Sequence, residues 1–305
     1  EGGAIWYDRP VTADLADGLR GAGFRGEILR EEPLARHTTW RIGGPAEALA
    51  FPTDRDDLGL AIRFANERAC PYRVLGNGSN LLVRDGGVRG LVLRPRGALA
   101  EVRVARSRIE AGSGAALPAV ARLAAERGLS GLEFAAGIPG TVGGAVIMNA
   151  GSHEHEIAAV VESVEFLDPR GAARRIPAGE CGFGYRRSAL RGLPGVVLEA
   201  ALVLRPDDPA AVRERIAGFS ASRRASQPTE LPSCGSVFRN PPGDSAGRLI
   251  DRAGLKGLRV GDIEVSPRHA NFLVNVGLGS ARDALALVEI VEREVRDRFG
   301  VALVR

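Results

Sequence analysis

The sequence predicts an α+β fold divided into two or three compact units, and three observations support this prediction. The chain has 305 residues, which is too long for one small domain. Helical and strand periodicity alternate along it, yet no βαβ nucleotide-binding unit opens it. The segment Arg205-Pro206-Asp207-Asp208-Pro209 is charged and holds two prolines, so it marks the clearest boundary.

Periodicity and end signals place the elements. Thr53 is expected to cap the second helix, Gly128 to end the third, and Ser280 with Asp283 to form a capping box on the last. The expected helices are Asp14–Ala22, Thr53–Arg68, Ala115–Arg127, 209–225, Ala246–Ala253 and Ser280–Gly300. The expected strands are 46–51, Tyr72–Leu75, Leu81–Val83, Leu91–Leu93, Glu101–Ala105, Arg108–Ala111, Ser163–Leu167, Val196–Leu204, Ile263–Val265 and Phe272–Val276. Apart from its one helix, the stretch 1–35 is expected to be an extension in loop conformation.

The composition excludes several classes of protein. The chain is 45% hydrophobic and 26% charged, which is typical of a globular protein. Its net charge is +4, but both signs are interspersed and no basic run or aromatic platform indicates a nucleic-acid partner. No signal-peptide pattern and no membrane-length apolar run are visible. We therefore expect a cytoplasmic protein without a membrane partner.

The three cysteines do not indicate a disulfide framework or a metal site. Cys70, Cys181 and Cys234 are far apart, odd in number and without a C-x-x-C pair. Buried thiols in a reducing compartment are the expectation, and no metal is predicted.

A first glycine-rich loop, Gly76-Asn77-Gly78-Ser79-Asn80, lies between two expected strands. Glycine allows positive φ and close backbone approach, while Asn and Ser add hydrogen-bond donors. The loop is therefore a candidate cradle for a diphosphate, and a plain turn is the alternative.

A second glycine-rich segment, Gly137–Ala145, holds four glycines and opens an apolar stretch. Such a segment lets backbone lie against a flat or charged ligand. It matches neither G-x-G-x-x-G after a strand nor the P-loop pattern. The alternative is the start of a packed helix.

A hydrolase site is not favoured. Ser236 lies between Gly235 and Val237, but residue 238 is Phe, so the nucleophile elbow G-x-S-x-G is absent. The four histidines, His37, His153, His155 and His269, each suit a structural or surface role better than catalysis.

Taken together, the motifs resemble one family, the UDP-N-acetylenolpyruvoylglucosamine reductases (MurB). The resemblance covers about residues 36–300, with the motifs in the right order, which is specific although each motif alone is weak. The matching segments are Thr38–Ala46, Leu75–Leu82, Gly131–Phe134, Ile138–Ala145, Met148–Gly151, Phe183–Arg186, Gly235–Phe238, Ala246–Gly247 with Leu249–Ile250, Val265–Ser266 and His269–Ala270. The stretch after Ser188 lacks a long tyrosine-bearing insertion, so the chain resembles the second, shorter type.

The resemblance implies a fold of the vanillyl-alcohol-oxidase (PCMH) type, in which two subdomains bind FAD, followed by a C-terminal α+β substrate-binding domain. The implied ranges are an N-terminal extension at 1–35, FAD-binding subdomains at 36–95 and 96–205, and the substrate-binding domain at 206–305. Non-covalent FAD would contact Gly76, Asn77, Gly78, Ser79, Asn80, Ile138, Pro139, Gly140, Thr141, Gly143, Gly144 and Asn149. The UDP-sugar would contact Tyr185, Arg223, Arg239 and Asn240. For Arg223 and its neighbour Arg224, a solvated helix end is the alternative.

The resemblance also implies the reaction. NADPH reduces FAD and leaves, the enolpyruvyl sugar nucleotide binds in the same cleft, and hydride is delivered to the terminal carbon of the enol ether. Arg186 matches the catalytic arginine, whose planar charged fork suits an enolate. Ser236 matches the proton donor, and no metal is required. The protein is expected to act as a monomer in peptidoglycan precursor synthesis.

One expected residue is missing. The family pairs the arginine and serine with a glutamate just before a C-terminal Val-Arg, whereas this chain ends Phe299-Gly300-Val301-Ala302-Leu303-Val304-Arg305. The segment is about three residues short. Three explanations remain open: those residues belong to the protein but not to this sequence, the acid is absent, or Glu292 or Glu294 substitutes for it.

Two rival functions remain. The first is an oxidase of the same fold, which would often tether FAD through His or Cys, but no such residue lies in Asn77–Asn80. The second is a flavin- or UDP-sugar-binding protein that has lost catalysis, which the missing glutamate would favour.

Overall fold

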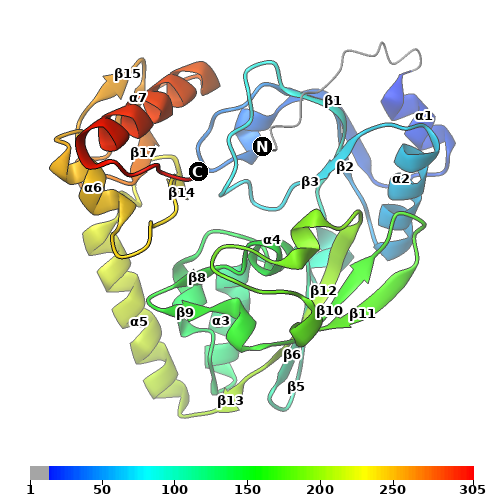
Figure 1. The fold of residues 1–305 in the computed structure, drawn as a ribbon. Helices are drawn as coiled ribbons and strands as arrows, with labels where there is room; N and C mark the ends of the chain where they lie inside the picture. Colours follow the sequence, from blue (N-terminus) through cyan, green and yellow to red (C-terminus); the bar gives the residue numbers. More distant parts are fainter. Residues whose placement is uncertain (1–13) are drawn as a thin grey trace.

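Three sheets of four or five strands organise residues 14–305, the part of the chain that the computed structural model describes (Figure 1). The first thirteen residues of the predicted extension lie outside the described residues. Helices and strands occur in every part of the rest, so the predicted α+β class is confirmed.

The first unit is a four-stranded sheet in the order β1-β2-β4-β3. Its strands are β1 (Glu27–Pro33), β2 (Pro45–Phe51), β3 (Tyr72–Val74) and β4 (Val88–Leu93). β1 is antiparallel to β2, and β2 and β3 run parallel to β4. Helices α1 (Leu15–Gly21) and α2 (Arg55–Glu67) pack their apolar residues against this sheet, because Leu19, Leu58 and Ile62 join one buried cluster with Ala48 and Leu91.

Three local predictions in this unit are wrong. Residues 27–33 form the edge strand β1 rather than loop. Asp54, not Thr53, caps α2, since its carboxylate accepts from the amide of Asp57 at 3.0 Å. The apolar run Leu81–Val83 forms no strand; Leu82 packs against the C-terminal unit and Val83 against the first sheet.

The second unit is an antiparallel five-stranded sheet in the order β11-β10-β12-β6-β5. Its strands are β5 (Val102–Ala105), β6 (Arg108–Gly112), β10 (Val161–Leu167), β11 (Ala173–Pro177) and β12 (Val196–Val203). Helices α3 (Leu117–Glu126) and α4 (Val142–Met148) contribute to its core, which includes Ile109, Val120, Val146 and Leu202. The last four residues of the second glycine-rich segment, 142–145, are thus the first turn of a packed helix, α4.

Two short pairs of strands complete the second unit. β7 (Leu129–Ser130) pairs with β13 (Arg205–Pro206), so the predicted boundary begins in a paired segment. β8 (Gly151–Ser152) and β9 (His155–Glu156) form a hairpin.

The C-terminal unit begins with the long helix α5 (Pro209–Ser226), which rises along the left of the second unit in Figure 1. It continues with the antiparallel sheet β14-β17-β16-β15 and helices α6 (Ala246–Arg252) and α7 (Ala281–Phe299). The strands are β14 (Ser233–Ser236), β15 (Arg259–Val260), β16 (Ile263–Val265) and β17 (Phe272–Asn275). The predicted Ser280–Asp283 capping box is confirmed, and Gly300 ends α7 with φ +69°.

The C-terminal core contains residues from the first unit. Trp40 and Ile42, each 2% exposed, lie in the same buried cluster as Leu249, Leu287 and Val291. The hydroxyl of Thr39 donates to the carbonyl of Ser233 at 2.7 Å, and Asn275 donates to the carbonyl of Trp40 at 3.3 Å. These contacts fix the C-terminal unit against the loop that precedes β2.

Candidate functional site

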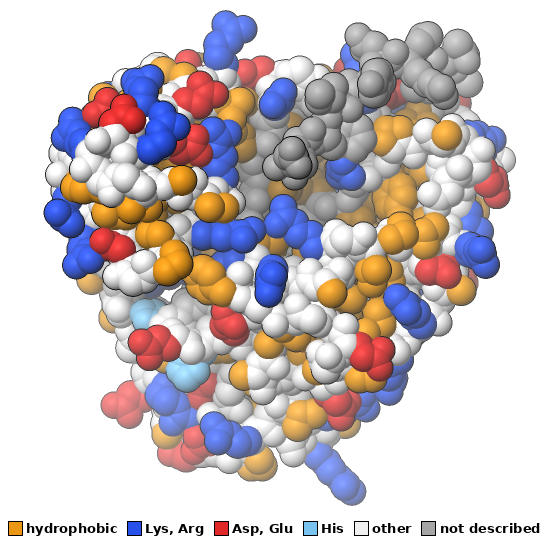
Figure 2. All heavy atoms as spheres, in the orientation of Figure 1, with side chains coloured by type: hydrophobic (Ala, Val, Ile, Leu, Met, Phe, Trp, Pro, Cys, Tyr) orange, Lys and Arg blue, Asp and Glu red, His pale blue; other side chains and the backbone are white. Residues whose placement is uncertain are grey.

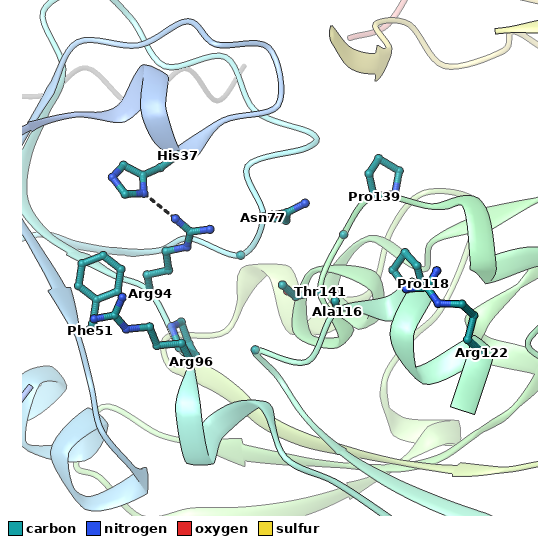
Figure 3. Close-up of a pocket in the computed structure, with 14 residues that line it drawn as sticks. His37, Phe51, Asn77, Arg94, Arg96, Ala116, Pro118, Arg122, Pro139 and Thr141 are labelled. Carbon is teal, nitrogen blue, oxygen red and sulfur yellow. Dashed lines mark hydrogen bonds between the residues drawn. The ribbon is translucent and has the colours of Figure 1, made fainter. Parts of the chain in front are cut away.

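A cavity of about 520 Å³ lies where the first glycine loop meets the second glycine-rich segment (Figure 3). Loops from two different units therefore form opposite walls of one site. The lining residues are His37, Phe51, Gly76, Asn77, Arg94, Pro95, Arg96, Gly114, Ala116, Pro118, Arg122, Pro139, Gly140 and Thr141.

Five predicted cofactor residues line this cavity together: Gly76, Asn77, Pro139, Gly140 and Thr141. Gly76 and Thr141 are so close that a Cβ at residue 76 would lie 2.6 Å from the Thr141 hydroxyl. The two glycine-rich segments are thus in direct contact.

Other predicted loop residues have supporting positions. Gly78 has φ +62°, and a Cβ there would lie 2.3 Å from the carbonyl of His37. This glycine is required by the loop's own packing. Ser79 lies across from Gly140, at 3.7 Å from the ideal Cβ position of that glycine, and Asn80 is exposed.

The start of α4 is satisfied within the protein. Thr141 caps it through a 3.4 Å bond from the amide of Gly144, and the amide of Gly143 donates to the carbonyl of Ser113 at 2.9 Å. Ile138 is half-buried against the second unit's core. Among these predicted cofactor residues at the start of α4, Gly144 is the one that is exposed to solvent.

Three arginines in the cavity were not predicted: Arg94, Arg96 and Arg122. Burial, with the nearby charge of Arg96, lowers the pKa of Arg94. Arg96 pairs with Glu27 at 2.5 Å and lies over the ring of Phe51 at 3.7 Å. Within residues 14–305, neither Arg94 nor Arg122 has a carboxylate partner, so both charges face the cavity unneutralised.

His37, also unpredicted, holds Arg94 in place. One ring nitrogen, Nδ1, lies 2.5 Å from the Arg94 guanidinium (Figure 3). The other, Nε2, lies 3.0 Å from the carboxylate of Glu32. Since the guanidinium can only donate, Nδ1 accepts and Nε2–H donates to Glu32. The Arg94-Pro95-Arg96 run directly after an expected strand was the signal that could have located this wall.

The donor set of the cavity suits a polyanion such as a dinucleotide's diphosphate. Guanidinium groups bind phosphate through paired N–H donors. At Gly140, the space that a side chain would fill is open: the nearest atom to its ideal Cβ position is the Ser79 hydroxyl, at 3.7 Å. The residues present therefore fit FAD.

Arg186 sits in a strained tight turn. Gly184 and Arg187 exchange backbone hydrogen bonds of 3.0 Å, and Arg186 between them has φ +55°. This left-handed position normally takes Gly or Asn, and non-glycine residues held there cluster at functional sites. Arg186 donates to the carbonyl of Gly151 at 2.6 Å and lies 5.0 Å from the ring centre of Tyr185, which is 49% exposed.

Asn149 is 1% exposed and supports this turn rather than opening to the cavity. Its amide donates to Glu156 at 2.7 Å and to the carbonyl of Gly184 at 3.0 Å, and its oxygen accepts from Ala158 at 3.1 Å. Its φ of +44° ends α4. The side chain is fully used by protein partners.

Ser236 ends β14 and is exposed. Arg239, three residues on, donates its amide to the carbonyl of Val304 at 2.7 Å, which brings the C-terminal segment beside this strand. The side-chain oxygen of Asn240 accepts from the amide of Ala246 and so supports the start of α6. Within residues 14–305, no hydrogen bond or ion pair joins the Arg186 turn to the Ser236 segment.

Arg223 lies near the C-terminal end of α5, against Gly137 of the second glycine-rich segment. A Cβ on Gly137 would be 3.0 Å from its Cδ. Burial lowers the pKa of Arg223, and its side chain has no partner within the described chain. A desolvated, unpaired guanidinium favours an anionic ligand over a solvated helix end. In Figure 2, Lys and Arg side chains gather at the centre of the face shown, where the C-terminal unit meets the other two.

The two candidate substitutes for the missing acid are already engaged. Arg305 forms two hydrogen bonds with Glu292, of 2.6 and 2.7 Å, and Arg298 pairs with Glu294 at 3.0 Å. Both glutamates lie on α7. Each carboxylate therefore already has an arginine partner in the structure.

Comparisons with known proteins cover most of the chain. Residues 46–176 match the model of an FAD binding domain, and residues 227–305 match the C-terminal domain of UDP-N-acetylenolpyruvoylglucosamine reductase.

No helix within residues 14–305 has the length and apolar character needed to cross a membrane.

Individual relatives agree with these matches. The chain is 50% identical to UDP-N-acetylenolpyruvoylglucosamine reductase 2 of Symbiobacterium thermophilum, over 91% of this chain and 90% of the relative. It is 52% identical to the reductase of Rubrobacter xylanophilus, over 90% and 92%. Among solved structures, the reductase (MurB) from Thermus caldophilus superposes with a TM-score of 0.78 at 42% identity, covering 92% of this chain and 97% of that one.

Proposed function

The chain belongs to the UDP-N-acetylenolpyruvoylglucosamine reductase family, and we propose that it catalyses that family's reaction. The reaction is the NADPH-dependent, FAD-mediated reduction of UDP-N-acetylenolpyruvoylglucosamine to UDP-N-acetylmuramate in peptidoglycan precursor synthesis. The structural observation that supports it best is the meeting of two glycine-rich segments, from different units, at one arginine-lined cavity.

FAD, when bound, supplies the two-electron chemistry that links NADPH to the enol ether. We propose that the cavity binds it through the backbone of Gly76, Asn77, Gly140 and Thr141. Arg94, which follows β4 beside the Gly76 loop, would neutralise phosphate charge and is held by His37. Asn149 acts indirectly, through the protein contacts of its side chain.

The catalytic step assigns distinct roles to Arg186 and Ser236. Reduction at the terminal carbon of the enol ether leaves negative charge that spreads to the substrate carboxylate. Arg186 would stabilise this charge with a guanidinium whose position is set before the substrate arrives. Ser236 would then donate its proton to the neighbouring carbon, which is basic enough to accept from a hydroxyl.

Substrate binding would involve both sides of the cleft. The exposed ring of Tyr185 offers a surface beside Arg186, and the unpaired guanidinium of Arg223 suits the UDP diphosphate. Arg239 and Asn240 lie on the loop after Ser236 and are proposed to bind the substrate beside it. The amide nitrogen of the Asn240 side chain has no protein partner within residues 14–305.

The remaining organisation is also a proposal. It consists of FAD-binding subdomains at 36–95 and 96–205 and a substrate-binding domain at 206–305. The pairing of β1 with β2 favours adding residues 27–35 to the first subdomain. We propose a monomer that works in the cytoplasm.

An anaerobic titration followed by absorbance tests this function. Purified holoprotein should be yellow, NADPH should bleach it, and UDP-N-acetylenolpyruvoylglucosamine should restore the colour. Acid precipitation should release free FAD, whereas a tethered oxidase would keep it in the pellet. A binding protein without catalysis would bleach with NADPH and stay bleached when substrate is added.

A further inference from the structure

The β8–β9 hairpin has an unfavourable turn. His153 and Glu154, its two turn residues, have φ of +51° and +65°. Two-residue hairpin turns of this kind favour Asn-Gly, because both positions need positive φ. Neither residue here is Gly or Asn, so contacts outside the turn must hold the hairpin in this shape.

Aromatic contacts supply part of that support. The ring of His153 lies 4.7 Å from Phe219 on α5, and the ring of His155 stacks on Phe134 at 5.9 Å. The hydroxyl of Ser152 also donates to the carbonyl of Phe134 at 2.9 Å. The hairpin is therefore fixed between the second unit and the first helix of the C-terminal unit.

Both strands of the hairpin contact Arg186. From β8, the carbonyl of Gly151 accepts from one terminal nitrogen at 2.6 Å. From β9, one carboxylate oxygen of Glu156 lies 3.7 Å from the other terminal nitrogen. The guanidinium is thus held at both ends of its fork, and its Nε has no partner within the described residues.

Glu156 is itself held. Its second carboxylate oxygen accepts from Asn149 at 2.7 Å, and the same amide nitrogen donates to the carbonyl of Gly184, the first residue of the Arg186 turn. Asn149 therefore ties the carboxylate and the turn together. One oxygen of Glu156 is anchored and the other faces the guanidinium.

We propose that Glu156 is a positioning residue for the reduction step: it fixes the orientation of the Arg186 guanidinium so that the fork is preorganised for the substrate carboxylate. This rests on the proposed catalytic role of Arg186. Because Arg186 occupies a strained turn, its side chain has no orientation imposed by regular secondary structure, and the hairpin imposes one. Glu156 acts through Arg186 and needs no contact with substrate.

A double-mutant cycle tests this inference on the holoenzyme. The variants are Glu156→Gln, Arg186→Gln and the double variant, with Glu154→Gln as a matched control. Glu154 lies in the same hairpin, is exposed, and has no ion pair or side-chain hydrogen bond within residues 14–305. For each variant, stopped-flow absorbance measures flavin bleaching by NADPH and reoxidation by the enolpyruvyl substrate.

Glu156→Gln should slow reoxidation by about tenfold or more while bleaching stays near the wild-type rate. Glu154→Gln should leave both within about twofold. In the Arg186→Gln background, Glu156→Gln should add almost nothing, since the group through which it acts is gone. Glu156→Asp retains the charge with a shorter reach and gives a second, independent variant if Glu156→Gln loses FAD.

Three results would overturn the inference while leaving the proposed role of Arg186 intact. Wild-type reoxidation in both Glu156 variants would show that the carboxylate is dispensable. An effect of Glu156→Gln that is undiminished in the Arg186→Gln background would assign it a structural role independent of Arg186. Faster reoxidation in Glu156→Gln would show that the carboxylate competes with substrate for the guanidinium. If Arg186→Gln reoxidised at the wild-type rate, that result would instead refute the proposed role of Arg186, and the inference with it.

Discussion

Asp85 in the first unit accepts a hydrogen bond of 2.8 Å from the backbone amide of Ala281, the first residue of α7. Its other carboxylate oxygen accepts from the backbone amide of Arg282 at 3.0 Å. A side chain nearly two hundred residues upstream thus completes the capping of the last helix. It also places a negative charge at the positive end of that helix's dipole.

Asp85→Ala should lower the free energy of unfolding by about 1 kcal/mol, the usual cost of losing a helix-capping side chain. Urea unfolding followed by circular dichroism measures this. Asp56→Ala is the control, because Asp56 is an exposed acid in the first turn of α2 without a capping bond. If both substitutions lowered the free energy of unfolding equally, the contact of Asp85 with the start of α7 would contribute no specific stability.

Gly140→Val should remove FAD without unfolding the chain, because residue 140 lines the cavity and its ideal Cβ position has only the Ser79 hydroxyl within 4 Å, at 3.7 Å. Gly78→Val should lose both FAD and stability, since its Cβ would collide with the carbonyl of His37. The ratio of flavin to protein absorbance, with a thermal unfolding curve, separates the two results. Gly179, which has no neighbour within 4 Å of its ideal Cβ, gives the control Gly179→Val. Stoichiometric yellow protein from Gly140→Val would disprove the cofactor role of this loop.

Ser236→Ala should still be bleached by NADPH, whereas reoxidation by the enolpyruvyl substrate should slow by several orders of magnitude. The hydroxyl is needed only when the reduced carbon skeleton is protonated. Reoxidation within about tenfold of wild type, or roughly 1.4 kcal/mol of barrier, would exclude Ser236 as the proton donor. Ser233→Ala, on the same strand, is a suitable control.

Glu292→Gln should change reoxidation by less than about tenfold, because Arg305 already engages both oxygens of this carboxylate. Stopped-flow reoxidation by the enolpyruvyl substrate is the measurement. A loss of about a hundredfold or more, with bleaching unaffected, would identify Glu292 as an acid that serves the reduction step.

Cys234 should resist thiol reagents in the folded protein. Burial raises the pKa of Cys234 to about 12. The thiolate is the reactive form, so its fraction at pH 8 should be on the order of one in ten thousand, and labelling should increase as the pH rises. Because the residue is half-buried, Ellman's reagent at pH 8 should label it much more slowly in the native protein than after denaturation. Rapid labelling of the native protein at Cys234 would contradict the raised pKa of this thiol.

Local sequence patterns predicted the elements that are marked by helix caps or by hydrophobic periodicity within a few turns. The capping box of α7 and the periodicity of α2 depend on residues within a few turns, and both helices form as expected. Strand β1 was missed because its sequence, Glu-Ile-Leu-Arg-Glu-Glu-Pro, alternates poorly and becomes a strand only through pairing with β2. Leu81–Val83 was misassigned for the converse reason: its apolar side chains pack against two different units instead of pairing in a sheet.

The residues of the candidate site also fall into two groups: those that a local sequence pattern reveals and those that only folding brings together. The glycine-rich segments carry their own signature, so the sequence located two walls of the cavity. His37, Arg94 and Arg122 come from three separate segments of the chain and meet only in the folded protein. Likewise, nothing in the sequence alone connected Glu156 to Arg186, since the hairpin and the turn are thirty residues apart and are joined through the buried amide of Asn149.

The packing of Trp40 within the C-terminal core has a consequence for synthesis on the ribosome. The loop before β2 emerges early, yet its buried partners on α6, β17 and α7 are translated more than two hundred residues later. Until then, a tryptophan and an isoleucine stay uncovered on the nascent chain and are available to chaperones. Ribosome-bound chains that stop before α7 should therefore bind such factors at this loop, and release should coincide with completion of the last helix.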